Sequence, residues 1–332
     1  MAPSIFSRFF PLLLLTLTSV AAVGVELEKR DDAAAKKLVP GGYIPKKFPA
    51  VLGLILYGFS GILHWIHFAR SPVRWILALP IGMITMAIGF GLRLYFVSHM
   101  TKGIYIAMYL FILLSPCLYL AADYAILSHL TATFDKSITD RALLIRPTRI
   151  VRIFVWSDVL TFLIQAGGGT MLTNDNPNTR KLGSKVAMIG LILQGLSFML
   201  FTVLVLLFAY RVRRRFPEAW GPKRIRWEEL SPVFGSTPID EWRPLLFVVV
   251  ITCIGILIRS VFRLIEFAEG SNGYLQSREG FFYALDALPL WISMSLYCIV
   301  WPARFTQNTR ESSAAAFQMG PGSKVGLATG VA

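Results

Sequence analysis

The sequence predicts an all-α, polytopic membrane protein built as a bundle of seven transmembrane helices. Of the 332 residues, 55% are hydrophobic and only 16% are charged, whereas a soluble domain carries about 25% charged residues. The apolar residues are grouped in blocks of about 20, which is long enough for a helix to cross roughly 30 Å of hydrocarbon. A membrane β-barrel would instead have strands of about 10 residues with strict alternation.

Seven apolar blocks follow one another between residues 48 and 304, and we take this region as one membrane domain. Most links are short, and the two longer ones are 128–149 and the basic segment 211–243. The boundaries should hold within a few residues. The expected spans are 48–69, 75–97, 103–127, 150–172, 186–210, 245–267 and 281–300.

The two ends of the chain differ from the membrane domain. In residues 1–24, Arg8 precedes a short apolar run that ends in small residues, which predicts a signal peptide; the alternative is an additional, uncleaved span. Residues 25–47 would then form an extracellular segment, in which Lys29-Arg30 is a candidate processing site. Residues 305–332 are rich in Ser, Ala and Gly, and we expect them to form a disordered cytoplasmic tail.

The basic residues indicate the orientation in the membrane. The odd-numbered links and the tail hold 17 Lys and Arg residues, and the even-numbered links hold 5. Because basic residues gather on the cytoplasmic side, we expect the mature N-terminus outside and the C-terminus in the cytoplasm. The net charge of +14 therefore indicates topology and contact with anionic lipid headgroups, above all at the link 211–243, and not a nucleic-acid partner.

Charged side chains stand within the last two spans. Arg259, Arg263 and Glu266 share one helix face, and Asp286 lies in the next span. Ionised groups in hydrocarbon cost at least about 2.5–3.5 kcal/mol each, so they persist when paired or facing a polar cavity. One interpretation is ion pairs that hold the two spans together. The other is an outward-facing pocket in which three arginines, counting Arg93, exceed two carboxylates by one charge and suit a lipid phosphate or carboxylate.

A second polar face belongs to the fourth span. Asp158, Thr161 and Gln165 are spaced i, i+3, i+7, and three glycines follow at 167–169. The glycines indicate either a tight helix crossing or unwound backbone that lines a cavity shielded from lipid. They lack the Lys-Ser/Thr pair and the strand–helix context of a nucleotide-binding loop, so no cofactor is predicted.

Histidines raise a third possibility. His64 and His67 stand near the inner end of the first span, and Asp123 and His129 near the inner end of the third. Such a set could hold zinc for hydrolysis. The His-X-X-His spacing is weakly specific and no activating Glu follows His64, so the favoured interpretation is interfacial histidines beside Trp65, with no metal site.

Several sequence blocks are specific together, although none is specific alone. They are YIP at 43–45, IGFGLR at 88–93, SPCLYLAADY at 115–124, IFVWSDVLTFLIQAGGG at 153–169, GLILQG at 190–195, IRSVFRLIEFAEG at 258–270 and EGFFYALDALP at 279–289. With these blocks, the chain resembles the fungal lipid-translocating exporter family, the RTA-like seven-span proteins, over roughly residues 43–304.

The resemblance implies a multi-pass protein that reaches the plasma membrane by the secretory pathway. It also implies export or flopping of sphingoid bases and other amphiphiles, resistance to lipid stress and drugs, and no enzymatic activity. Membrane lipids are the implied partners, and the oligomeric state is left open. The family-like polar set includes Glu279, which we leave out of the candidate binding and translocation residues. Those candidates are Arg93, Asp158, Gln165, Gln194, Arg259, Arg263, Glu266 and Asp286.

Two departures mark this chain as a divergent member of the family that it resembles. The Glu that usually precedes the GFGLR motif in the second span is missing, and Trp301-Pro302-Ala303 stands where the family often has His-Pro-Gly. The leading functional hypothesis is a lipid or amphiphile translocator. The alternatives are a seven-span lipid sensor or receptor and an intramembrane zinc-dependent lipid hydrolase.

Overall fold

The computed structural model describes residues 46–306, except 100, 135–138, 140, 144, 175, 221–238, 240 and 270–273. Within these residues there are helices and no strands, and seven helices are long and apolar enough to cross a membrane. The predicted all-α, seven-span architecture is therefore confirmed. The predicted signal peptide and nearly all of the N-terminal segment and the tail lie outside the described residues. The predicted orientation stays a prediction.

Six membrane spans begin and end within a few residues of the expected positions. The seven spans, of which α8 is the exception, are α3 (Lys47–Arg70), α4 (Ala78–Ser98), α5 (Lys102–Thr131), α7 (Pro147–Met171), α8 (Pro177–Arg215), α11 (Arg243–Glu269), and a last span made of α13 (Glu279–Phe281), η2 (Phe282–Ala287) and α14 (Leu288–Ile299). Shorter elements are η1 (Arg74–Ile76), α9 (Pro217–Trp220), α12 (Tyr274–Ser277) and α15 (Pro302–Thr306).

The fifth span, α8, is much longer than predicted. It has 39 residues, which at about 1.5 Å each make a helix of roughly 58 Å, far longer than the hydrocarbon core. Hydropathy alone locates only its apolar middle. Asn176 caps the first turn, its side chain accepting from the backbone N–H of Asn178, and Pro177 occupies a position where no N–H is needed.

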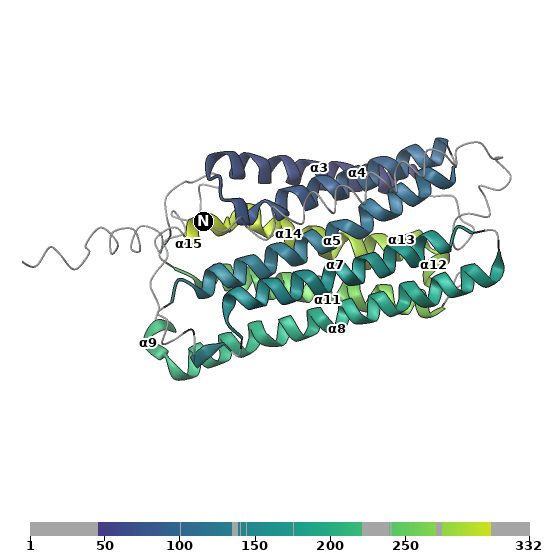
Figure 1. Ribbon diagram of the computed structural model, residues 1–332. Coiled ribbons are helices and arrows are strands. Elements are labelled where there is room, and N and C mark those ends of the chain that lie inside the picture. Colours follow the sequence, from purple (N-terminus) through teal and green to yellow (C-terminus); the bar gives the residue numbers. More distant parts are fainter. Residues whose placement is uncertain are drawn as a thin grey trace, which may run out of the picture.

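The helices form one closed bundle (Figure 1). Consecutive spans pack side by side from α3 to α8, α11 then packs against α8, and α14 lies between α11 and α3. The third span, α5, also contacts α11, so α5 and α11 lie between the two sides of the bundle. Large apolar side chains are exposed on the outer faces of α3, α7 and α8, where lipid chains cover them in a membrane.

Glycines allow α7 and α8 to pack closely. A methyl group at Gly168 would lie 2.5 Å from the backbone nitrogen of Ala187, and one at Gly190 would lie 2.7 Å from the side chain of Gln165. The helix α7 runs unbroken through the three glycines at 167–169. The expected tight helix crossing is therefore correct, and the alternative of unwound backbone is wrong.

We predict opposite effects of alanine at two neighbouring glycines. Gly168→Ala forces backbone against backbone and should lower the stability by about 1–3 kcal/mol, seen as a lower apparent melting temperature in detergent. Gly167→Ala is the matched control, because a methyl group there meets nothing within 4 Å and alanine is the better helix former. Equal melting temperatures for the two variants would contradict this packing.

Candidate functional site

A network of buried ion pairs joins α11 to the last span. Arg263 holds the carboxylate of Asp286 with two nitrogens at 2.8 Å each, and Arg259 donates to the same carboxylate. Arg263 also donates to Glu266 at 3.1 Å. Asp286 is fully buried. A buried carboxylate with two guanidinium partners has its charge and its lone pairs satisfied, which is the condition for keeping ionised groups away from water.

A π-helical turn brings Asp286 to this position. The last span winds as α-helix up to Phe281, as π-helix over η2, and again as α-helix from Leu288. Pro289 follows directly and has no N–H to donate to the preceding turn, which favours a local departure from α geometry. The hydroxyl of Tyr57 on α3 donates to the carbonyl of Ala287 at 2.7 Å and so ties η2 to a third helix.

A second ion pair joins the last span to α4. Arg93 donates to Glu279 at 2.9 Å, and the guanidinium also lies over the rings of Phe282 and Tyr283. Glu279 also accepts from the backbone N–H of Lys46 at 2.8 Å. Glu279, which is not among the candidate residues, therefore belongs to the ion pairs of the last span. The signal was present in the sequence, because Glu279 stands seven residues before Asp286 in the motif EGFFYALD.

Glu279 changes the charge of the site. The sequence alone suggested three arginines and two carboxylates. The structure pairs Arg93 with Glu279, and sets Arg259 and Arg263 against Glu266 and Asp286. Three arginines thus face three carboxylates, and the expected excess positive charge is absent from this network.

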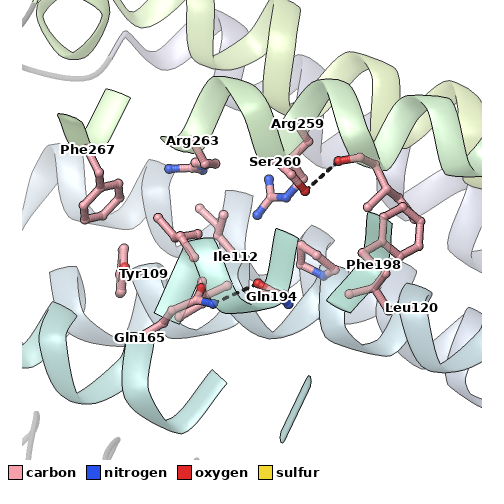
Figure 2. A pocket seen from close by; sticks show the side chains of 14 residues that line it. Tyr109, Ile112, Leu120, Gln165, Gln194, Phe198, Arg259, Ser260, Arg263 and Phe267 are labelled. Carbon is pink, nitrogen blue, oxygen red and sulfur yellow. Dashed lines mark hydrogen bonds between the residues drawn. The ribbon is translucent and has the colours of Figure 1, made fainter. Parts of the chain in front are cut away.

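A pocket lies beside the network, between α5, α7, α8 and α11 (Figure 2). Arg259, Ser260 and Arg263 on α11 face Gln165 of α7 and Gln194 of α8 across it. The cavity itself is small, about 40 Å³. The other walls are apolar or aromatic. They are formed by Tyr109, Ile112, Leu113, Pro116, Leu120, Leu191, Phe198, Ile256 and Phe267.

The two glutamines form one wall of the pocket as a pair. Gln165 donates from its amide nitrogen to the amide oxygen of Gln194 at 2.9 Å, and Gln194 donates to the sulfur of Cys117 on α5 at 3.4 Å. The packing of α8 against α7 at Gly190 puts these side chains within reach of each other. The sequence predicted both glutamines, but not the part that Cys117 takes.

The structure gathers most of the predicted residues in two groups. Arg93 and Glu266 belong to the ion-pair network together with Arg259, Arg263 and Asp286. The pocket joins Arg259 and Arg263 to Gln165 and Gln194, while Asp158 is buried outside its lining.

The histidines pack in the core and do not form a metal site. His64 and His67 are buried near the end of α3, with exposed fractions of 0% and 3%, and their interfacial position in the membrane stays a prediction. Both contact Trp301, which stacks on His67 at a ring distance of 5.0 Å. His129 stacks instead on Trp75. Among the described residues, no three His, Cys, Asp or Glu side chains are placed to hold a metal ion, so the set expected by the zinc alternative does not assemble.

The first residues of the basic link 211–243 belong to α8, which ends at Arg215. Arg213, Arg214 and Arg215 form its exposed last turn. Cations are favourable at a helix C-terminus, which helps to explain why the helix persists beyond its apolar part. Arg211 donates to the carbonyl of Ala142 at 3.4 Å, so it is partly engaged within the protein. Residues 221–238 of the link lie outside the described part.

The closed bundle with paired charges at membrane depth defines a multi-pass integral membrane protein with a polar site among its helices. The chain matches the model of the RTA1-like protein family over residues 79–309. Because this match covers more than half of the chain, the protein belongs to the RTA1-like family.

Individual relatives share a modest fraction of identical residues with this chain. Protein RTA1 of Saccharomyces cerevisiae is 30% identical over 200 residues, which are 60% of this chain and 56% of that protein. The probable lipid transporter atnI of Emericella nidulans is 27% identical over 259 residues, 76% and 65% of the two chains. The sphingoid long-chain base transporter RSB1 of Saccharomyces cerevisiae is 23% identical over 309 residues, 84% and 78%. The chain thus spans little more than half of RTA1. No solved structure matches it.

We predict that Asp286→Asn destabilises the protein more than Glu279→Gln. Removing the charge of Asp286 leaves Arg259 and Arg263 with one buried carboxylate, Glu266, between them, and breaking a buried pair in this way costs about 3–5 kcal/mol. When Glu279 is neutralised, the guanidinium of Arg93 still lies over the rings of Phe282 and Tyr283, so the loss of stability is smaller. Thermal melting in detergent measures both.

A third variant controls for loss of charge alone. Glu241→Gln removes the partner of Arg243, which begins α11 at the far end of the bundle and whose guanidinium is more exposed. This variant should melt close to the unmodified protein. A melting temperature for Asp286→Asn equal to that of Glu241→Gln would contradict the importance of the network.

Proposed function

We propose that this protein is a transporter that moves amphiphilic lipids, such as sphingoid bases, across the membrane. The observation that carries the proposal is the composition of the pocket. Two facing walls present guanidinium and hydroxyl groups on α11 and amide groups on α7 and α8, and the remaining walls present aliphatic and aromatic side chains. A molecule with a polar head and an apolar chain can contact both kinds of wall at once, whereas a purely polar solute leaves the apolar walls uncovered.

The balanced charges favour a head that forms hydrogen bonds over one that carries a strong negative charge. Because Glu266 and Asp286 neutralise Arg259 and Arg263, a phosphate would have to displace a carboxylate to gain a full ion pair. Hydroxyl and amino groups need only the amide groups of Gln165 and Gln194 and the hydroxyl of Ser260. These are the groups of a sphingoid base.

The relatives support the same class of substrate. One carries the name of a sphingoid long-chain base transporter and another that of a probable lipid transporter. We infer from these names and the pocket that the present protein transports lipids and is not an enzyme. We further propose a position in the plasma membrane, with the pocket in the outer half of the bilayer and the arginine-rich end of α8 on anionic headgroups of the cytoplasmic leaflet.

Filling the pocket should stop transport. Ser260 lies on the pocket face of α11, and Ser260→Phe would place a ring where the headgroup is proposed to bind. The measurement is movement of a fluorescent sphingoid base across the membrane of vesicles that contain the purified protein. We expect the rate to fall to that of protein-free vesicles.

The matched control stands two residues away on the same helix. Ile258 lies on the opposite, exposed face of α11, so Ile258→Phe adds the same ring towards the lipid and should leave the rate unchanged. Vesicles with a fluorescent phosphatidic acid test the headgroup, for which we expect slower movement. Equal rates for Ser260→Phe and Ile258→Phe, or no movement with the unmodified protein, would refute the proposal.

A further inference from the structure

Asp158 is a buried carboxyl group that has no partner. It lies near the middle of α7, roughly 16 Å from its start at about 1.5 Å per residue, and only 2% of it is exposed. Neither of its carboxylate oxygens has a hydrogen-bond partner among the described residues, and none of their ion pairs includes it. Asp123 also stands outside those ion pairs, but one of its oxygens accepts a hydrogen bond.

The neighbours of Asp158 come from the two helices that pack against α7. From α5, the hydroxyl of Tyr124 lies close enough to interact with the carboxyl group, but the two do not form a hydrogen bond of normal geometry. The thiol of Cys117, also on α5, lies close enough to interact electrostatically with Asp158. These are the titratable groups that α5 directs towards it.

Among the described residues, no basic side chain forms an ion pair with Asp158. On α8, Lys185 lies between residues that contact Gly168, about 15 Å along α7 from Asp158. On α7 itself, Arg152 is exposed.

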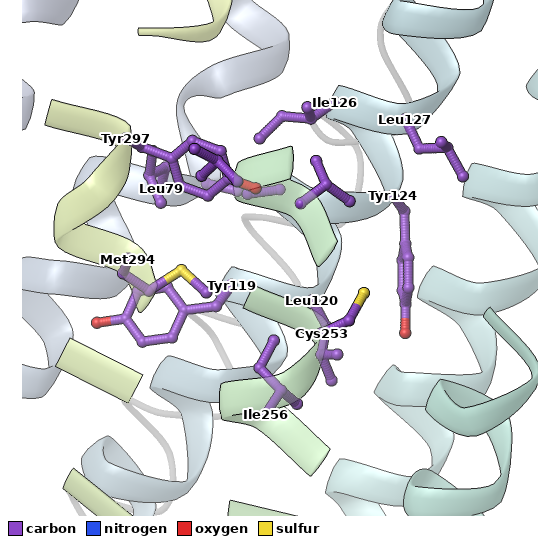
Figure 3. Close-up of a cluster of buried hydrophobic side chains, with 14 of the residues drawn as sticks. Leu79, Tyr119, Leu120, Tyr124, Ile126, Leu127, Cys253, Ile256, Met294 and Tyr297 are labelled. Atoms are coloured by element: carbon purple, nitrogen blue, oxygen red, sulfur yellow. The ribbon is translucent and has the colours of Figure 1, made fainter. Parts of the chain in front are cut away.

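The neighbouring carboxylate, Asp123, faces away from this site. It accepts a hydrogen bond from Tyr297 of α14 at 2.7 Å. In Figure 3, Tyr297 and Tyr124 lie on opposite sides of the buried cluster. The consecutive residues Asp123 and Tyr124 of α5 thus each contribute to a separate tyrosine–aspartate contact. The contact of Asp123 with Tyr297 contains a hydrogen bond to one carboxylate oxygen, whereas that of Tyr124 with Asp158 contains none.

We propose that Asp158 is a proton-binding site. An ionised carboxylate with no partner in a medium from which water is excluded is strongly unfavourable, whereas the protonated group is neutral. The ligand of the site is therefore H⁺. Tyr124 stands ready to donate to the carboxylate whenever the proton leaves, and to accept from the carboxyl group when the proton is bound.

The site is placed to respond to the contents of the pocket. Gln165 lies two helical turns from Asp158 on the same face of α7, and its hydrogen bonds continue through Gln194 to Cys117, which adjoins Asp158. A headgroup that draws the glutamines away from each other frees Cys117 and admits polar contacts to Asp158. Bound lipid and proton affinity are then linked, and transport is coupled to protons. This linkage rests on the proposed function, but the proton site does not.

The proton site is tested on the purified protein by infrared spectroscopy in lipid nanodiscs at neutral pH. A protonated carboxyl group has a carbonyl stretch that ionised carboxylates lack. We expect this band in the unmodified protein and its loss or reduction in Asp158→Asn. Glu241→Gln should leave it unchanged, because Glu241 is paired with Arg243, and Asp123→Asn separates any contribution of Asp123.

An identical spectrum for Asp158→Asn would overturn the proton site. Should that variant fail to fold, Tyr124→Phe probes the same group: loss of the hydroxyl should shift the band, and an unshifted band would overturn the site equally. The linkage is tested separately with the fluorescent sphingoid base in vesicles under an imposed proton gradient. We expect the gradient to change the rate in the unmodified protein and to lose its effect in Asp158→Asn.

The two proposals fail in different ways. The carbonyl band without lipid movement would leave the proton site standing and refute the proposed function. Lipid movement that ignores both the gradient and Asp158→Asn would refute the coupling and leave the proposed function standing.

Discussion

The ion pairs around Asp286 are the interaction on which the arrangement of the other helices depends. Charges in hydrocarbon are tolerated only when their partners are fixed in place, so Arg259 and Arg263 determine where the last span must lie against α11. The π-helical turn η2 places Asp286 beside these two arginines, and Glu279 on the same span forms an ion pair with Arg93 on α4. The last two spans and α4, which is distant from them in sequence, are thereby held in register.

The network also shapes the pocket beside it. Arg259 and Arg263 form part of the pocket wall, but their charge is already balanced by Glu266 and Asp286, which do not line the pocket. The wall can therefore offer hydrogen bonds without holding a strong anion. The opposite wall, the glutamine pair, depends on the close approach of α7 and α8 at Gly190. The pocket thus lies between a network of balanced charges and a tight helix crossing.

Asp158 and Asp286 differ in their partners, and therefore in whether a change of protonation is expected. Both are carboxyl groups buried among the membrane helices, yet one has two arginines and the other has only an unsatisfied tyrosine hydroxyl nearby. A fully paired carboxylate has no reason to change its protonation. An unpaired one does, and it lies on the same face as the pocket wall of α7. The fold thus combines a rigid side, α11 with the last span, and a side that can respond to protons.

Much of this arrangement follows from sequence pattern. Block length and hydropathy give the seven spans, and spacing puts Arg259, Arg263 and Glu266 on one face opposite Asp286. Sequence pattern does not predict features that depend on contacts between distant parts of the chain. Hydropathy misses the polar ends of α8, because capping and terminal arginines extend a helix without apolar residues. Glu279 falls just outside the expected span 281–300, yet it begins the last helix and reaches Arg93. The stacking of His67 on Trp301, which stands far later in the chain, has no signal in the spacing of the histidines.

The most direct test of the pocket is photo-crosslinking with a photoactivatable sphingoid base, followed by mass spectrometry of the labelled peptides. The account predicts labels on the pocket faces of α5, α8 and α11, near Pro116, Leu191 and Ser260, and their suppression by excess unlabelled sphingoid base. Labels confined to the outer face of α11, near Ile254 and Ile258, and not suppressed by competitor would contradict it.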